Sequence, residues 1–532
     1  MHIADEFRKS MNWLHTWLGI ALSGVLFAVF WMGSLSVFMY ETDQWMMPEA
    51  RGPAVETVSL DETVLPWLEQ SDVSAEQSVF VVMPSVRKPL LRVGVFGGDN
   101  GPLNAYFDPA TGKQVERTGT FGSSGFFYPF HYSLHINWQG LGYWIVGLAA
   151  MAMLTLVVSG IFIHRKIVQD FFSFRPTKAL RRSTLDLHNI TGLVALPFHI
   201  LFPLTGITIF ALVYFEGAAL KPFKGEVFDY TREANGYYVI EPDGVAADPV
   251  QSVDGFIEEA EAIWTSRSGT PASADYIRIE AYGDTNSKVV IQHSGPRLQV
   301  ARSQGRIVYD AASGEMEQDF QPAPIRNALS WLEGAHYMMF RPYHVRWLLF
   351  FGGLMGAAMI ATGLLFWMRA RIRKGLEPTS VRVVRALSVG SITGMIGASG
   401  AFLLANRLLP LDIDGDGRAY LEVLVFYSVW LLSFVHAAIR NKQAWRDQVW
   451  VIAGIAFLAP VLNWVSTGDF LTVSISQGQW AVAGTDLVIL ASGGLAVFAA
   501  LRLKQTERVE AAKAQRRPVA GSLADAASVP AE

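Results

Sequence analysis

The sequence predicts an all-α membrane bundle of about eight helices that carries two small α+β domains on one side. Three observations support this fold class. Apolar residues make up 51% of the 532-residue chain, whereas charged residues make up 17%. Several apolar runs exceed about 18 residues, which is long enough to cross a bilayer. Two long links between these runs are more polar and contain strand-like segments.

The apolar runs also predict the domain organisation. The spans cover about residues 13–40, 140–163, 189–214, 345–368, 384–405, 419–439, 447–466 and 481–502. The first run has no small-residue cleavage site after a short apolar core, so we expect a retained helix and no removed signal peptide. The expected parts are a first helix within 1–40, an outer domain at 41–139, two helices at 140–214 with a cytoplasmic link at 164–188, a second outer domain at 215–344, a fourth helix at 345–374, a four-helix extension at 375–503 and a disordered cytoplasmic tail at 504–532.

The distribution of basic residues predicts the orientation in the membrane. Lysine and arginine gather in the links after the second, fourth and sixth spans and in the C-terminal tail. By the positive-inside rule, these segments and both termini are cytoplasmic. The two long links carry more acidic than basic residues and would lie in the periplasm of a bacterium. We therefore expect a protein of the bacterial inner membrane.

Missing residues and motifs exclude several classes of chemistry. The chain has no cysteine, which excludes disulfides, iron–sulfur clusters, thiolate catalysis and covalently attached haem. The cytoplasmic links contain no GxGxxG motif and leave no room for a flavin or nicotinamide domain. No nucleic-acid partner is expected, and any redox metal must be held by histidine, methionine or oxygen ligands.

The two outer links resemble each other. Each offers a helix-like stretch, then strand-like runs, and then an aromatic–Asp–x–x–Thr/Ser–Gly turn, at residues 107–112 and at residues 309–314. Such turns favour hairpins, because aspartate and threonine bond nearby amides and glycine accepts a positive φ. The alternative is two unrelated hairpins, but the shared order favours two repeats.

Histidines mark the cytoplasmic ends of the first spans. His15, His164 and His188 lie at similar depths on three helices, where imidazoles can supply axial ligands to one b-type haem. His199 lies eleven residues after His188, which places both on one face of an ideal helix, at two depths. His199 is a further ligand candidate, or it bonds a carbonyl near the flanking prolines.

A second histidine group lies at the outer ends of the second and fourth spans. With no cysteine in the chain, clusters at opposite faces best fit two bis-histidine haems that carry electrons across the bilayer. The alternative is ordinary interfacial histidine. Basic residues near both groups could pair with haem propionates, or they are the usual interfacial charges. The outer histidines are His131, His135, His336 and His344, and the propionate candidates are Arg165, Lys166, Arg181, Arg182, Arg341 and Arg346.

An EF-hand-like segment, LDIDGDGRAYLE, lies between the fifth and sixth spans. Asp412, Asp414 and Asp416 alternate before Gly417, as in a calcium loop. Glu422 falls one residue early for the bidentate position, so a solvated outer turn competes with a calcium site.

Four stretches together resemble the PepSY-associated transmembrane family. They are NWLHTWLGIALSGVLF, LHINWQGLGYWIVGLAAMAMLTLVVSGIFIHRK, LDLHNITGLVALPFHILFPLTG and RWLLFFGGLMGAAMIATGLLFWMRAR, and the outer repeats resemble PepSY domains. The resemblance covers about residues 8–374. Within the family, the sequence is similar above all to the PiuB-like iron-uptake proteins and inner-membrane siderophore reductases. It implies a four-helix haem-binding core; His15, His135 and His188 match recurrent family positions, as do His164, His199 and His336 of its HRK, PFH and outer-histidine motifs. It suggests no role for the extension beyond residue 375.

The leading hypothesis is therefore a dihaem b-type ferric-siderophore reductase, an oxidoreductase with no catalytic residue beyond the haems. Its expected partners are the lipid bilayer, a ferric siderophore, a quinol or separate reductase as electron donor, and a periplasmic iron-binding protein. One alternative is a non-enzymatic PepSY module that binds peptides or proteases or has a regulatory role. Another is a transporter that uses His199 and the proline-broken third span, although no paired intramembrane carboxylates suggest proton coupling.

Overall fold

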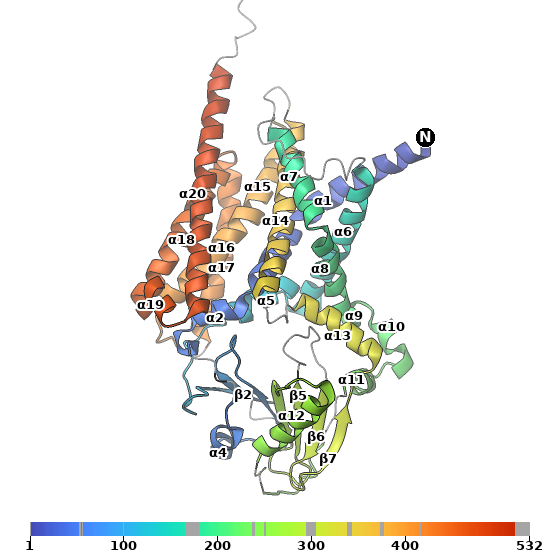
Figure 1. The fold of residues 1–532 in the computed structure, drawn as a ribbon. Coiled ribbons are helices and arrows are strands. Elements are labelled where there is room, and N and C mark those ends of the chain that lie inside the picture. The colour runs from blue at the N-terminus through green and yellow to red at the C-terminus, as the bar shows by residue number, and fades with distance from the viewer. Residues whose placement is uncertain are drawn as a thin grey trace, which may run out of the picture.

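A bundle of long helices stands beside a smaller β-sheet region (Figure 1). The computed structural model describes residues 2–52, 55, 57–98, 101–164, 180–236, 240–248, 250, 252–293, 305–337, 343–372, 377–413 and 416–515. The N-terminal end and the end of α20 both lie on the side of the bundle that faces away from the sheet (Figure 1). The predicted combination of a helical membrane bundle and a separate β-containing part is confirmed at this level.

The membrane bundle consists of long apolar helices. Within the described residues, seven helices are long and apolar enough to cross a membrane, and an eighth span results if the bent pair α7–α8 is counted as one. The seven are α1 (His2–Ser36), α6 (Leu141–Ile163), α14 (Tyr343–Arg371), the continuous run of α15 (Thr379–Val389), a π-turn (Gly390–Gly394) and α16 (Met395–Leu408), then α17 (Gly417–Arg440), α18 (Ala444–Thr467) and α20 (Trp480–Gln515).

The predicted third span is broken. Helix α7 (Leu180–Val194) and helix α8 (Leu196–Ile209) are bent by 62° at Ala195. Pro197 in the first turn of α8 has no amide hydrogen to continue the ladder of the preceding helix, which favours a break here. The assumption of one ideal helix, and with it a shared face for His188 and His199, is therefore wrong.

The outer region is built on one antiparallel sheet of seven strands. The strand order is β3–β2–β1–β4–β5–β6–β7, with β1 and β4 paired at the junction of the two repeats. Helices α3 (Leu60–Thr63), α4 (Leu65–Gln70) and α12 (Asp254–Ser268) contribute to the same hydrophobic core as the strands. The strands are β1 (Ser78–Val82), β2 (Leu91–Phe96), β3 (Leu103–Phe107), β4 (Tyr276–Glu280), β5 (Lys288–His293), β6 (Gly305–Asp310) and β7 (Met316–Phe320).

The two repeats interlock through equivalent aspartates. Asp254 accepts hydrogen bonds from the Leu60 amide (2.8 Å) and from the Ser59 hydroxyl (2.6 Å) at the start of α3. Asp61 accepts the Val253 amide (2.6 Å) and the Ser252 hydroxyl (2.6 Å) at the start of α12. Each of the two predicted repeats thus caps the helix of the other.

The boundaries of the outer domains need correction. The repeats share one sheet and one core, so they form a single unit in place of two separate domains. Both predicted turns are present, with Gly112 at φ 66° and Gly314 at φ 75°. The link predicted to be cytoplasmic at residues 164–188 ends earlier than predicted, because α7 already begins at Leu180. The tail is also shorter, because α20 continues to Gln515.

Short helices connect the bundle to the sheet. Helices α2 (Met39–Met46), α5 (Gly122–Ser133) and α13 (Pro324–His336) lie at the end of the bundle that faces the sheet (Figure 1). The other short helices are α9 (Ala211–Tyr214), α10 (Glu216–Leu220), α11 (Val227–Asn235) and α19 (Leu471–Ser476). Two of these connecting helices, α5 and α13, carry histidines toward the membrane region.

Candidate functional site

The first histidine pair lies near the end of the bundle that faces away from the sheet. The ring centres of His15 on α1 and His188 on α7 are 6.3 Å apart, and the ring planes are nearly perpendicular, at 84°. The Nδ1 atom of His15 lies 3.0 Å from the Leu156 carbonyl and 3.1 Å from the Ser159 hydroxyl. The Nδ1 atom of His188 lies 2.8 Å from the Met359 carbonyl. These contacts fix both rings.

The second pair lies at the end of the bundle nearest the sheet. The ring centres of His131 on α5 and His336 on α13 are 5.8 Å apart, at an interplanar angle of 32°. His131 Nδ1 lies 2.8 Å from the Val29 carbonyl, and His336 Nδ1 lies 2.8 Å from the Thr205 hydroxyl. The sequence placed His131 and His336 in one group but did not pair them.

The spacing within each pair is suitable for a shared metal ion. An imidazole nitrogen binds a metal at about 2.0–2.1 Å and lies roughly 1 Å from its ring centre, so two rings on one ion have centres about 6–6.5 Å apart. The ring centres of His15 and His188, called the inner pair from here on, fall in this range. Those of His131 and His336, called the outer pair, are slightly closer together. In all four rings Nδ1 makes the orienting contact, and no Nε2 makes a hydrogen bond within the described part of the chain. Metal-bound histidines are oriented in the same way by their second nitrogen.

Each of the four imidazoles lies against a glycine of a neighbouring helix. A Cβ atom added to Gly33 would meet the His131 ring at 2.7 Å, and one added to Gly363 would meet His188 at 3.1 Å. The corresponding distance is 3.3 Å for both Gly160 against His15 and Gly206 against His336. Real Cβ atoms rarely approach other atoms this closely, so any larger residue would force the ring to move. Glycine at these four positions therefore leaves space for the four imidazole rings.

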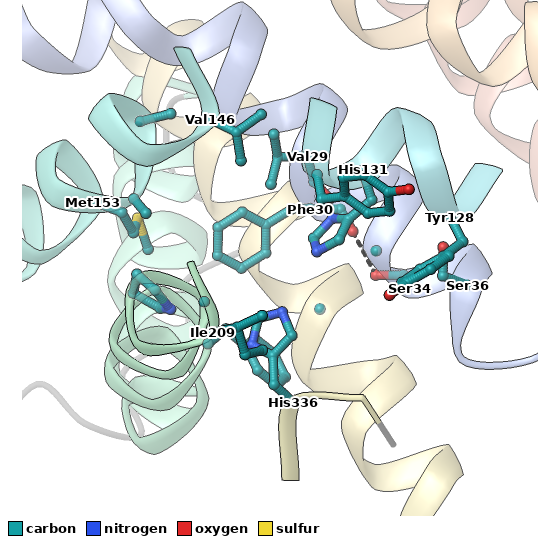
Figure 2. Close-up of a pocket in the computed structure, with 18 of the residues that line it drawn as sticks. Val29, Phe30, Ser34, Ser36, Tyr128, His131, Val146, Met153, Ile209 and His336 are labelled. Atoms are coloured by element: carbon teal, nitrogen blue, oxygen red, sulfur yellow. Dashed lines mark hydrogen bonds between the residues drawn. The ribbon is translucent and has the colours of Figure 1, made fainter. Parts of the chain in front are cut away.

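The outer pair borders a narrow cavity. Figure 2 shows His131 and His336 in its wall, together with Phe30, Tyr128 and Met153. Burial lowers the pKa of His131 and lowers that of His336 to about 3, so both imidazoles are neutral near pH 7 and can act as ligands. The cavity measures about 130 Å³, which is below the usual size of ligand pockets. A flat macrocycle such as haem would therefore fit only if the side chains that line this cavity moved apart.

Comparison with known proteins places the helical core in a family. The profile of the PepSY-associated TM region family matches residues 12–370, about two-thirds of the chain. The chain belongs to this family. It is also similar to the uncharacterized protein PA4219 of Pseudomonas aeruginosa, with 23% identity over 395 residues that cover 69% of this chain and 91% of the relative. The resemblance seen in the sequence is confirmed for the family, and the match ends before the C-terminal extension.

Three other candidate histidines of this PepSY-associated protein do not face another histidine. The ring of His135 stacks on Phe126 at 4.8 Å, and its Nε2 atom lies 2.9 Å from the Phe126 carbonyl. His164 Nε2 lies 3.2 Å from the Asn189 amide, next to the inner pair, and its Nδ1 is buried with no hydrogen-bond partner among the residues that the structure describes. His344 is exposed at the start of α14.

His199 is an unusual buried residue of the core. It is fully buried, and neither ring nitrogen has a hydrogen-bond partner within the described residues. Its ring meets Phe30 edge to face, with centres 5.9 Å apart. Because Phe30 lines the outer cavity, His199 is separated from that cavity by one side chain.

The basic residues assigned to propionates have other contacts. Arg346 is buried and pairs with Glu41 at 3.0 Å, and Arg182 pairs with Asp186 at 3.0 Å. Arg181 lies over the Phe366 ring at 5.8 Å. The charge of Arg346 is thus used within the protein. The remaining candidates, Arg165, Lys166 and Arg341, lie outside the described residues.

The EF-hand-like loop gains no support as a metal site. Asp414 lies outside the described residues, and no group of three or more histidines or acidic residues that could hold a metal occurs among the described ones, including Asp412 and Asp416. Glu422 is fully buried and bonds to Arg418 (2.8 Å) and Asn406 (2.9 Å). It is therefore committed to the helix bundle and not to the loop.

Proposed function

We propose that this PepSY-associated protein is an inner-membrane haem b electron-transfer protein that reduces ferric siderophore in the periplasm. The observation that carries the proposal is the presence of two oriented imidazole pairs at opposite ends of one helical core. On α1, 18 residues separate His15 from Gly33, the glycine against His131, so the pairs lie roughly 27 Å apart along this helix. This separation is comparable to the thickness of the hydrocarbon core, about 30 Å.

The protein's own residues have clear tasks in this proposal. His15 and His188 would hold an inner haem, and His131 and His336 an outer haem, each through Nε2. Contacts from Nδ1 to carbonyl and hydroxyl oxygens orient the rings. Bound haem supplies one-electron transfer, since its iron alternates between ferric and ferrous states. The absence of cysteine means that any such haem is held without covalent attachment.

The proposed direction of transfer and the proposed substrate rest on the predicted orientation and on the resemblance to siderophore reductases. With both termini cytoplasmic, the inner pair would receive electrons from quinol or from a separate reductase. The acceptor is a ferric siderophore, as the resemblance to PiuB-like proteins and siderophore reductases suggests. Siderophores offer hard oxygen ligands that suit Fe(III), so reduction to Fe(II) weakens the chelate. A periplasmic iron-binding protein could then take up the metal.

The first test is a haem count on the purified full-length protein. We expect a b-type absorption spectrum that changes with dithionite and a pyridine-haemochrome value near two haems per chain. His188→Ala and His336→Ala should each remove about one haem, and the double variant should remove both. Ferric siderophore should reoxidise the reduced wild-type protein.

A matched control is His436→Ala, because His436 lies outside both pairs, 3.8 Å from Asp447. This variant should keep the full haem content. A featureless spectrum from protein produced with ample haem would refute the proposal and would favour a non-enzymatic peptide-binding or regulatory role. Full haem retention in His15→Ala and His188→Ala would refute the inner-site assignment alone.

A further inference from the structure

A second, larger cavity lies between the family core and the C-terminal extension. Its volume is about 960 Å³, at the upper end of the range for small-molecule sites. The core contributes Trp31, Phe38 and Trp347 to its wall, and the extension contributes residues of α16, α18 and α20. The cavity is therefore complete only because this chain has helices beyond the family match.

The cavity is long and has one polar end. Its lining on α20 runs from Trp480 to Ser492, a rise of about 18 Å along a helix. Apolar residues such as Val488 and Ile489 line most of this length, whereas Gln44, Gln477 and Gln479 lie at the end near the sheet. The shape suits a molecule with a polar head and a long apolar tail.

The charged residues in the wall, Glu41 and Arg51, are already engaged by protein partners. Glu41 accepts hydrogen bonds from Arg87 (2.9 Å) and from Arg346 (3.0 Å). Arg51 pairs with Asp469 at 2.5 Å and also donates to the carbonyl oxygens of Gln44 and Trp45. A phospholipid phosphate needs an available cation or several charge-assisted donors. The wall instead favours a neutral head group.

We propose that this cavity binds a lipid quinone, a neutral aromatic head on an isoprenoid tail. At the polar end, Phe38, Trp347 and Phe350 contact one another, with ring centres 4.6 to 5.6 Å apart, and offer aromatic surface to a flat ring. Binding stands on the cavity alone and does not depend on the haem proposal.

The site lies beside the outer histidine pair, so a quinol bound here would supply the outer haem directly and not through the inner pair; this redox meaning rests on the proposed function. Trp31 and Leu35 of α1 face the larger cavity, while Gly33 and Ser34 of the same helix face the cavity of His131 and His336. One helix, about 10 Å across, therefore separates a bound quinone from the outer histidine pair. The C-terminal extension thereby gains a role that the family resemblance did not suggest.

The test is a titration of the purified full-length protein with ubiquinone-2, followed by quenching of tryptophan fluorescence. We expect saturable binding of about one molecule per chain. Gly484 lines the cavity, and a Cβ atom added there meets nothing within 4 Å. Gly484→Leu should therefore fill part of the cavity without a clash in the free protein. Ubiquinone-2 would then have to displace the leucine side chain, so binding should weaken by about tenfold or more.

Gly494→Leu is the matched control on the same helix. A Cβ atom at Gly494 also meets nothing within 4 Å, but this residue is exposed and lies outside the cavity wall. It should bind ubiquinone-2 within about twofold of wild type, and Val488→Phe provides a second blocked variant. Unsaturable quenching, equal binding by all variants, or a tightly held phospholipid that ubiquinone-2 cannot displace would overturn the proposal. Quinone binding by a haem-free protein would preserve the quinone-binding proposal and refute only the proposed reductase function.

Discussion

The side chain that Gly33 lacks decides where the His131 ring can lie. Glycine in a helix interior is unfavourable by about 1 kcal/mol relative to alanine, yet four helices each place one against a paired imidazole. At the scale of single residues, the pairs therefore depend on small neighbours as much as on the histidines themselves. The sequence signal that could have indicated this packing is a glycine within each apolar run, although the histidine it contacts lies on another helix.

Gly33→Ala should disturb the outer pair. The new Cβ atom would lie 2.7 Å from the His131 ring, so the ring must shift and its contact with the Val29 carbonyl should weaken. We expect a loss of about 1–3 kcal/mol of stability from overpacking and the loss of the outer haem alone. Thermal unfolding and the pyridine-haemochrome count measure these effects.

Gly19→Ala is the control, since it lies on the same helix and its added Cβ atom would meet Leu156 at an ordinary 3.7 Å. Wild-type stability and haem content in Gly33→Ala would contradict the packing explanation.

Acid should destabilise the outer sheet through Asp310. Burial acts in the opposite direction, but hydrogen bonds from Lys288 and Ser313 lower the pKa of Asp310 to about 2. The unfolded chain takes up this proton near pH 3.8 and the folded chain only near 2, so the stabilisation is present above pH 4 and disappears between these values. It amounts to about 2 kcal/mol. Thermal unfolding followed by circular dichroism at pH 5 and pH 2.5 should show this loss, which Asp310→Asn should reduce.

At the scale of elements, breaks and caps matter more than helix length. The bend between α7 and α8 separates His188 from His199, and α5 and α13 bring together two histidines more than 200 residues apart in sequence. In the outer unit, the two helix starts are capped by aspartates from the opposite repeat. Such exchanged contacts explain why the repeats form one sheet.

Asp61→Ala and Asp254→Ala should each destabilise the outer unit by about 0.5–2 kcal/mol, the usual effect of losing a helix cap. Each aspartate also lies in the helix start that the other one caps, so the double variant should lose less than the sum of the single losses. Thermal unfolding of all three proteins measures this coupling. Glu258→Ala, at an exposed position of α12, should change stability by less than about 0.5 kcal/mol, and strict additivity would contradict reciprocal capping.

At the scale of the whole molecule, the extension is joined to the core by buried polar contacts near the sheet. Trp45 of α2 donates to Asp486 of α20 at 2.7 Å, and Arg51 pairs with Asp469. Thr120, ahead of α5, donates to Glu422 of α17 at 2.5 Å. These contacts hold the extension in the place where it closes the larger cavity.

The absence of cysteine allows a direct test of orientation. Glu315 lies in the exposed turn between β6 and β7, and Lys442 lies in the exposed turn between α17 and α18. We expect a membrane-impermeant maleimide to label Glu315→Cys in cells with a permeabilised outer membrane. Lys442→Cys should react only after the inner membrane is disrupted. The cysteine-free parent is the control, and the reverse pattern would contradict the predicted topology.

The sequence by itself determined the helical membrane class, the presence of a strand-containing part and the family, and it predicted an outer duplication and two histidine groups. These features depend on local composition, spacing and motifs, which are present in the linear chain. Only the tertiary structure decided that His131 faces His336 while His135 stacks on Phe126, that the repeats share one sheet, and that the extension closes a cavity. Those outcomes depend on how helices distant in sequence pack, and a few small residues such as Gly33 and one break at Ala195 control that packing.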